Sequence, residues 1–162
     1  MEHTEDTAKD HRLGLVFLHI PVPHSPNSYD RRTGTFTLGN HAYSGYIDNL
    51  ALLDRTVGEF RETLEKSGDW NRMTIVFSAD HPYRSSRQLD GKTDSRVPFL
   101  VRFPGQTDSF DYSPQFNTVG TSDMLLAILQ GEVASSRQLA HWLDLHRDTT
   151  MVKIDPKAAS KN

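Results

Sequence analysis

The apolar positions of this chain fall into three short continuous runs and one longer run with helical spacing. The short runs lie in LGLVFLHI (13–20), RMTIVFSAD (72–80) and RVPFLVRF (96–103). Continuous apolar runs of this length are typical of strands that are buried on both faces of a sheet. The pattern therefore predicts three strands.

The strongest helical pattern lies between the first and second of these runs. Its apolar residues recur three or four positions apart, and Gly68 follows as a stop signal. The set consists of Tyr46, Ile47, Leu50, Leu53, Val57, Phe60 and Leu64. Two shorter helices are predicted near the C-terminus, over 123–132 and 137–146, after serine and threonine residues that can cap them.

Strands that alternate with helices favour an α/β fold with a mainly parallel sheet. We expect a flexible N-terminal segment over 1–12, one domain portion over 13–147 and a disordered tail over 148–162. Three strands are few for such a sheet, because parallel sheets are usually larger and covered on both faces.

Composition removes several classes of function. The chain has 162 residues, a formal net charge of -3 and no cysteine. Disulfides, cysteine zinc sites and a cysteine nucleophile are excluded. The charge gives no electrostatic reason to expect nucleic acid or an anionic membrane as a partner. Since no apolar run reaches the roughly 20 residues of a membrane span, we expect a soluble segment without membrane contact, and its compartment stays open.

Candidate chemistry gathers where two of the predicted strands end. Asp80 and His81 follow the second strand, and His19 and His24 lie at and after the end of the first. Sites in open α/β sheets collect at the carboxyl ends of strands. A carboxylate and a neutral imidazole are both good ligands for zinc or manganese.

Plainer interpretations of the same residues stay open. Asp80 fits a turn residue that accepts from its own backbone, His24 fits an exposed loop histidine, and His19 fits a core histidine. Arg84 and Arg87 fit either an anion site or solvated loop positions. The polar residues of DNLALLD (48–54) are interpreted as a helix surface.

Longer stretches carry a more specific signal. LVFLHIPVPHSP, TIVFSADH and RVPFLVRFPG occur in this order. Their residues and spacing resemble the C-terminal part of the catalytic domain of sulfatase-like hydrolases and transferases of the alkaline phosphatase superfamily. The resemblance covers this chain from Leu13 to about Gly131. The resemblance implies part of an alkaline-phosphatase-like α/β/α sandwich. It also implies a metal-dependent enzyme that acts on phosphate or sulfate esters.

The resemblance assigns roles residue by residue. Asp80 and His81 match the pair that holds the catalytic divalent metal, with zinc or manganese favoured over calcium or magnesium. His24 matches the catalytic histidine that contacts the transferring group. A histidine at position 81 favours phosphoryl over sulfuryl chemistry, and Pro82 departs from the glycine that commonly follows.

Nothing in this chain resembles the segments that carry the nucleophile and the remaining acidic ligands in the family. We therefore expect a missing N-terminal half as partner, possible self-association, and no activity from the isolated chain. The alternative is a non-catalytic binding or interaction module that kept the half-fold. A third interpretation is an ordinary α/β domain in which Asp80 and His81 form a turn.

Overall fold

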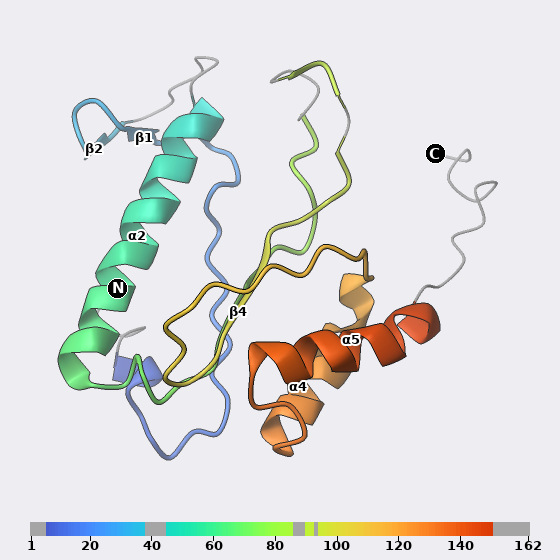
Figure 1. The fold of residues 1–162 in the computed structure, drawn as a ribbon. Coiled ribbons are helices and arrows are strands. Elements are labelled where there is room, and N and C mark those ends of the chain that lie inside the picture. Colours follow the sequence, from blue (N-terminus) through green and yellow to red (C-terminus); the bar gives the residue numbers. More distant parts are fainter. Residues whose placement is uncertain (1–5, 38–44, 86–89, 93, 151–162) are drawn as a thin grey trace. The chain divides into compact units, whose positions relative to one another are not determined.

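The computed structural model describes residues 6–37, 45–85, 90–92 and 94–150, with side chains up to His146 in the last helix. The chain forms two compact units, Met1–Asn71 and Arg72–Asn162. Figure 1 shows the elements of both units in sequence colours, and each unit is described here by itself.

The first unit is built on one long helix, α2 (Gly45–Ser67). A helical turn at residues 6–8 and a long irregular stretch precede it. A small antiparallel hairpin follows that stretch, formed by β1 (Tyr29–Asp30) and β2 (Thr35–Phe36). The sequence pattern predicts no strand there. The hairpin turn closes through Gly34, whose φ of 70° is in the left-handed region that glycine adopts without strain.

The predicted long helix is confirmed, and so is its end. Gly68 has a φ of 79°, and Asp69 donates its backbone N–H to the carbonyl of Leu64 at 2.9 Å. This is the hydrogen-bonded left-handed cap that ends many helices. The apolar stripe of α2 is only half-buried except at Leu64, whereas Asp48 and Asn49 are buried. The interpretation of DNLALLD as a helix surface is therefore wrong for its first two residues.

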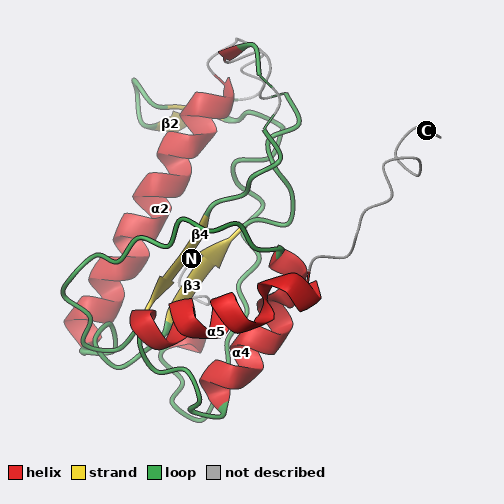
Figure 2. Ribbon diagram, turned by 45° about the vertical axis from the view of Figure 1, so that its right-hand side comes forward, coloured by secondary structure: helices red, strands yellow, loops and turns green. Residues whose placement is uncertain are grey.

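The second unit pairs β3 (Ile75–Ser78) with β4 (Phe99–Arg102) and then continues through three helical segments. These are the 3₁₀ turn η1 (Thr118–Gly120), α4 (Thr121–Leu129) and α5 (Ser136–Thr150). The expected cap of α5 is present, because Ser135 Oγ accepts from the backbone N–H of Gln138 at 3.3 Å. The expected cap of α4 is not, because α4 begins at Thr121 and its N-cap residue, Gly120, makes no side-chain cap hydrogen bond. Figure 2 shows α4 and α5 crossing beside the two strands.

A single hydrophobic cluster holds the second unit together. Its buried members come from the residue after β4, from α4, and from α5 and the turn before it: Phe103, Met124, Ala127, Val133, Leu139 and Leu143. Half-buried Val76 on β3 and Val101 on β4 pack against this cluster. The two C-terminal helices thus cover one face of the β3–β4 pair.

The strand predictions need two corrections. The segment 13–20 forms no strand, and Leu13, Leu15 and Phe17 in it are exposed, with Phe17 85% exposed. In addition, β3 and β4 run antiparallel. A parallel pair needs a crossover connection, whereas an antiparallel pair does not. Both sheets of the described residues are antiparallel, so a mainly parallel sheet is not confirmed.

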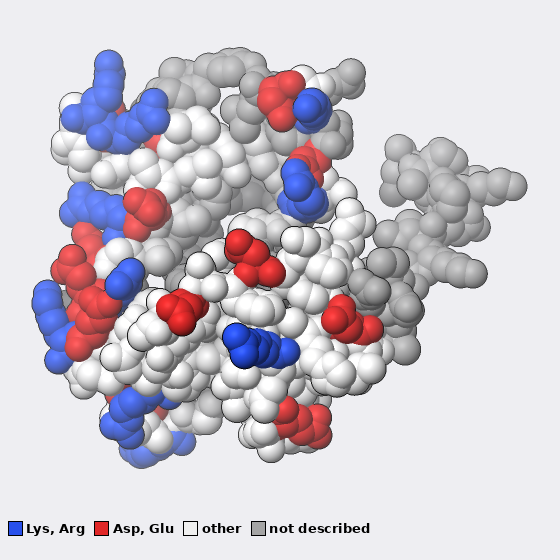
Figure 3. Space-filling model, in the orientation of Figure 1, with Lys and Arg blue, Asp and Glu red and all other residues white. Residues whose placement is uncertain are grey.

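The last helix extends into the segment that was predicted to be a disordered tail. Helix α5 runs to Thr150, and the rest of the expected tail lies outside the described residues. In the described part of the chain, no helix combines the length and apolar character needed to span a bilayer. Acidic and basic side chains intermix on the face drawn in Figure 3. Along α2, Arg55 pairs with Glu59 and Arg61 with Glu65, each four residues apart.

Candidate metal and ester site

The acidic and imidazole groups that follow β3 lie next to each other. Asp80 Oδ1 is 3.9 Å from His81 Nε2, with 85% of the Asp80 side chain and 36% of the His81 side chain exposed. The strand ends at Ser78 and the backbone bends at Asp80 and His81. This bend removes the strict alternation of a strand, so adjacent side chains can turn toward the same space.

The next residue fixes the protonation pattern of the histidine ring. His81 Nδ1 lies 2.8 Å from the carbonyl oxygen of Pro82. A carbonyl only accepts, so Nδ1 carries the proton and, in the neutral ring, Nε2 carries the lone pair. Ligating histidines are commonly set up in this way, with one ring nitrogen donating to a carbonyl and the other turned to the metal. Pro82, the departure from the family pattern, supplies that carbonyl.

The arrangement fits part of a metal site. Two donors 3.9 Å apart can both reach one cation at the ~2.1 Å typical of zinc ligands. Among the described residues the Asp80 carboxylate pairs with His81 and accepts no turn hydrogen bond, which weakens the simple turn interpretation. No cluster of three or more acidic or imidazole ligands is found in the described ranges. The pair would therefore supply two of the about four donors that a closed zinc site needs.

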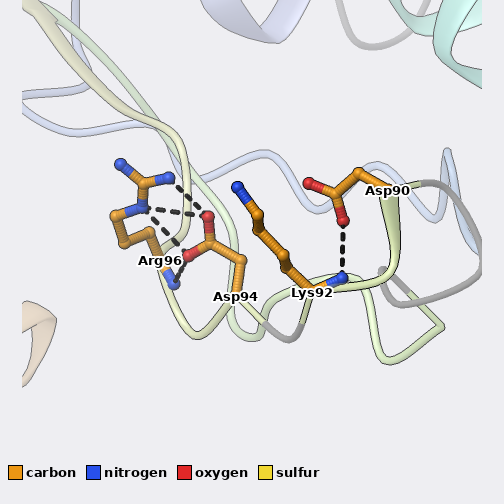
Figure 4. Close-up of polar contacts among 4 residues, drawn as sticks. All are labelled: Asp90, Lys92, Asp94 and Arg96. Atoms are coloured by element: carbon orange, nitrogen blue, oxygen red, sulfur yellow. Dashed lines mark hydrogen bonds and ion pairs between the residues drawn. The ribbon is translucent and has the colours of Figure 1, made fainter.

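The loop that continues toward β4 carries two backbone-bonded aspartates (Figure 4). Asp90 Oδ1 accepts from the backbone N–H of Lys92 at 3.0 Å. Asp94 Oδ1 accepts from both the backbone N–H and the side-chain Nε of Arg96, each at 2.9 Å. The Arg96 side chain lowers the pKa of Asp94 to about 2. These aspartates shape the loop, and their bonds leave Arg96 engaged rather than open to an anion.

His24 lies in the first unit, within the PHSP turn, and is exposed. Its Nδ1 is 2.7 Å from the carbonyl oxygen of Ser25, so Nδ1 carries the proton and Nε2 is the lone-pair nitrogen of the neutral ring. His19 is exposed as well, so its interpretation as a core histidine is wrong. A shared site of His24 with Asp80 and His81 stays a prediction. Arg84 is an exposed loop residue, and Arg87 lies outside the described residues.

Sequence reasoning missed the residue that holds the PHSP turn. The Nδ2 group of Asn49 on α2 donates to the carbonyl oxygens of Pro23 at 3.3 Å and His24 at 3.1 Å. Asn49 is only 2% exposed. The only available signal was a polar residue one position from the apolar stripe of a helix, and such residues are usually solvated.

Comparison with known proteins identifies the family. The family model described as Sulfatase matches residues 3–145, nearly the whole chain. The chain therefore belongs to the sulfatase family, a family of α/β hydrolases, as the sequence motifs predicted. Members of this family generally use a divalent metal, often calcium.

One curated relative is an arylsulfatase from Chlamydomonas reinhardtii, which is 35% identical over 92 residues. The match covers 50% of this chain and 14% of the arylsulfatase, so the chain spans a small part of the length of that relative. No solved structure matches the chain significantly.

Proposed function

We propose that this chain supplies metal-binding and group-contacting residues to a metal-dependent hydrolase or transferase that acts on phosphate or sulfate esters. The observation that carries the proposal is the Asp80–His81 pair after β3, with Nε2 of His81 turned toward a carboxylate 3.9 Å away. The pair belongs to a chain of the sulfatase family. Carboxylate and imidazole donors at a strand end suit a divalent cation.

The proposed roles follow from the chemistry of each group. Asp80 and His81 hold the cation, whose charge polarises the ester and favours a deprotonated nucleophile. The neutral ring of His24 carries its lone pair on Nε2, which can accept a proton and, once protonated, donate a hydrogen bond to an ester oxygen. The preference for zinc or manganese over calcium or magnesium rests on His81, because imidazole ligands suit the former pair.

Completion of the site requires residues beyond those gathered here. We propose that the nucleophile and the remaining ligands come from an N-terminal half of the same domain, in which the mainly parallel sheet is also formed. Two features support this. The described residues bring together two metal donors where about four are needed, and the apolar segment 13–20 is exposed and unpaired with any strand in the described structure.

Metal binding tests the first part of the proposal. Titration of this chain with zinc, manganese and calcium in a calorimeter should show weak binding, in the micromolar range or above, because two donors leave the cation largely hydrated. Asp80→Ala should abolish that binding, whereas Asp111→Ala, which removes an exposed aspartate elsewhere in the second unit, should leave it unchanged. Sub-micromolar one-site binding would contradict the view that ligands are missing.

Turnover tests the second part. The isolated chain with added metal should give no rate above background on aryl phosphates, phosphodiesters or aryl sulfates, since loss of a nucleophile from a cooperating site costs on the order of 10⁶-fold. Co-expression with the preceding half of a sulfatase domain should restore turnover, and Asp80→Ala should then remove it. The substrate that is turned over fastest decides between phosphoryl and sulfuryl chemistry. Metal-dependent turnover by the isolated chain, lost in Asp80→Ala, would refute the missing-half proposal.

A non-catalytic binding module is the second candidate. It is favoured by the small number of donors that the described residues bring together. If this candidate is right, reconstitution restores no turnover with any of the three ester classes, even when the assembled complex binds metal tightly.

A further inference from the structure

A buried amide on helix α2 joins that helix to the turn that carries His24. Besides the carbonyls of Pro23 and His24, Asn49 Nδ2 reaches the side-chain Oδ1 of Asn27 at 3.3 Å. These three acceptors come from both ends of the turn 23–27. One side chain, 25 residues away from His24 in the sequence, therefore ties the two ends of the turn to one point on the helix.

A second contact holds the same turn one helical turn earlier. Gly45 is buried, and a Cβ atom added there would lie 2.5 Å from Cγ of Asn27. Only glycine leaves room for the close approach of Asn27 to the first residue of the helix. Because positions 45 and 49 are four residues apart, they lie on the same helix face. The face of α2 that contacts the turn therefore has a glycine at position 45, which leaves room for Asn27, and the amide donor of Asn49.

The amide is retained at a cost. Asn49 Oδ1 is buried and has no hydrogen-bond partner among the described residues. The two hydrogens of Nδ2 are shared among three acceptors at 3.1–3.3 Å. A buried acceptor without a partner disfavours folding, and an apolar residue of similar size avoids this cost. A role in placing the turn accounts for an amide at this position better than helix stability does.

The orientation of the His24 ring depends on the backbone that Asn49 holds. Asn49 binds the carbonyl of His24, and the ring binds the carbonyl of the next residue, Ser25, through Nδ1. We propose that Asn49, with Gly45 beside it, is a positioning residue for His24. It fixes the backbone of the turn and so the direction of Nε2, without contact with the substrate. The catalytic consequence rests on the role of His24 proposed above, whereas the structural part does not.

The structural part is tested on the 162-residue chain by NMR. Asn49→Leu keeps the size of the side chain but removes the donor, and Gly45→Ala displaces Asn27 while leaving Asn49 in place. In both variants, the backbone order parameters at His24 and Ser25 should fall from about 0.85 to below about 0.6. Ring ¹⁵N shifts should show His24 leaving the single Nδ1–H form for a mixture of tautomers.

Glu62→Gln is the matched control on the same helix, because the Glu62 side chain is 69% exposed. Glu62→Gln should change neither the backbone order parameters at His24 and Ser25 nor the ring ¹⁵N shifts of His24. Thermal unfolding shows whether each variant is folded. If Asn49→Leu does not fold, Gly45→Ala decides. Unchanged order at His24 and Ser25 in a folded variant overturns the inference, whatever the activity.

The catalytic part is tested in the complete, reconstituted hydrolase. Asn49→Leu should lower kcat by about 100-fold, the effect expected from a displacement of about 1 Å in a catalytic group. Adding Asn49→Leu to His24→Ala should cause no further loss, because a positioning residue acts only through the group it positions. If His24→Ala leaves kcat unchanged, the proposed role of His24 fails and the catalytic part fails with it. If the losses of the two single variants multiply, Asn49 does not act through His24 and the catalytic part is overturned.

Discussion

At the scale of single residues, the Asp94–Arg96 pair predicts a measurable response to acid. The hydrogen bonds from Arg96 lower the pKa of Asp94 to about 2, below the roughly 3.9 of an aspartate in an unfolded chain. A pKa that is lower in the folded state stabilises the fold above about pH 4, and this contribution is lost as the pH falls through about 2. A carboxyl ¹³C titration should give a midpoint near 2 for Asp94.

Arg96→Gln should move that midpoint up toward the ordinary range, because it removes the guanidinium. Arg84→Gln removes an exposed arginine from the same connection between the strands and should leave the midpoint unchanged. A midpoint near 4 in the unaltered chain would show that the ion pair drawn in Figure 4 does not persist in solution.

Asp48 provides a second prediction at this scale. Its side chain is 5% exposed and lies 3.0 Å from Nε of Arg31. Removal of Arg31 takes away a cation that lies against a buried carboxylate, so Arg31→Ala should lower the free energy of unfolding by about 1–3 kcal/mol. The neighbouring Arg32 pairs with Asp30 and is 86% exposed. Arg32→Ala should therefore change stability by less than about 0.5 kcal/mol in denaturant titrations.

The sequence showed the Asp80–His81 pair but not the polar groups that support the first unit. Asp80 and His81 are adjacent, so their proximity needs no tertiary information beyond the end of a strand. The partners of Asp48 and Asn49, in contrast, lie 17 to 26 residues away in the sequence, and apolar periodicity carries no information about such pairs. A buried polar residue on a helix therefore looks like a surface residue until its partner is known.

At the scale of elements, two glycines of the α2 region should respond to alanine in opposite directions. Gly68 has a φ of 79°, so Gly68→Ala should destabilise the first unit by about 1 kcal/mol, the cost of a left-handed alanine. Gly58 lies inside the helix and has no atom within 4 Å of an added Cβ. Gly58→Ala should stabilise the unit by about 0.5–1 kcal/mol. Thermal unfolding of the two variants in parallel measures both, and equal signs would contradict the assigned cap.

Helices were predicted more accurately than strands because their signals are local. The spacing in α2, the Ser135 cap of α5 and the stop at Gly68 all lie within a few residues of the element they define. A strand exists only through its partner. The run 13–20 has the composition of a strand but no paired neighbour in the described structure. The antiparallel direction of β3 and β4 depends on how the chain connects them, and apolar runs carry no information about that connection.

At the scale of the whole molecule, the exposed segment 13–20 predicts association. Unpaired backbone groups next to exposed apolar side chains favour strand addition. Sedimentation velocity should show oligomers that increase with protein concentration. Phe17→Lys should reduce them, because it places a charge at the most exposed apolar side chain of the segment. Leu145→Lys, at an exposed position on α5, is the control. A strictly monomeric chain at high concentration would contradict this prediction.

The contact between Gly45 and Asn27 has an evolutionary consequence. A side chain larger than hydrogen at position 45 would overlap Asn27, and Asn27 in turn accepts a hydrogen bond from Asn49. The three positions are therefore not free to vary independently. Relatives that keep a histidine turn of this shape should retain all three, whereas relatives that have lost the glycine should also have replaced the asparagine at 27. Inherited covariation of these positions would mark the lineages in which the turn still holds its histidine in place.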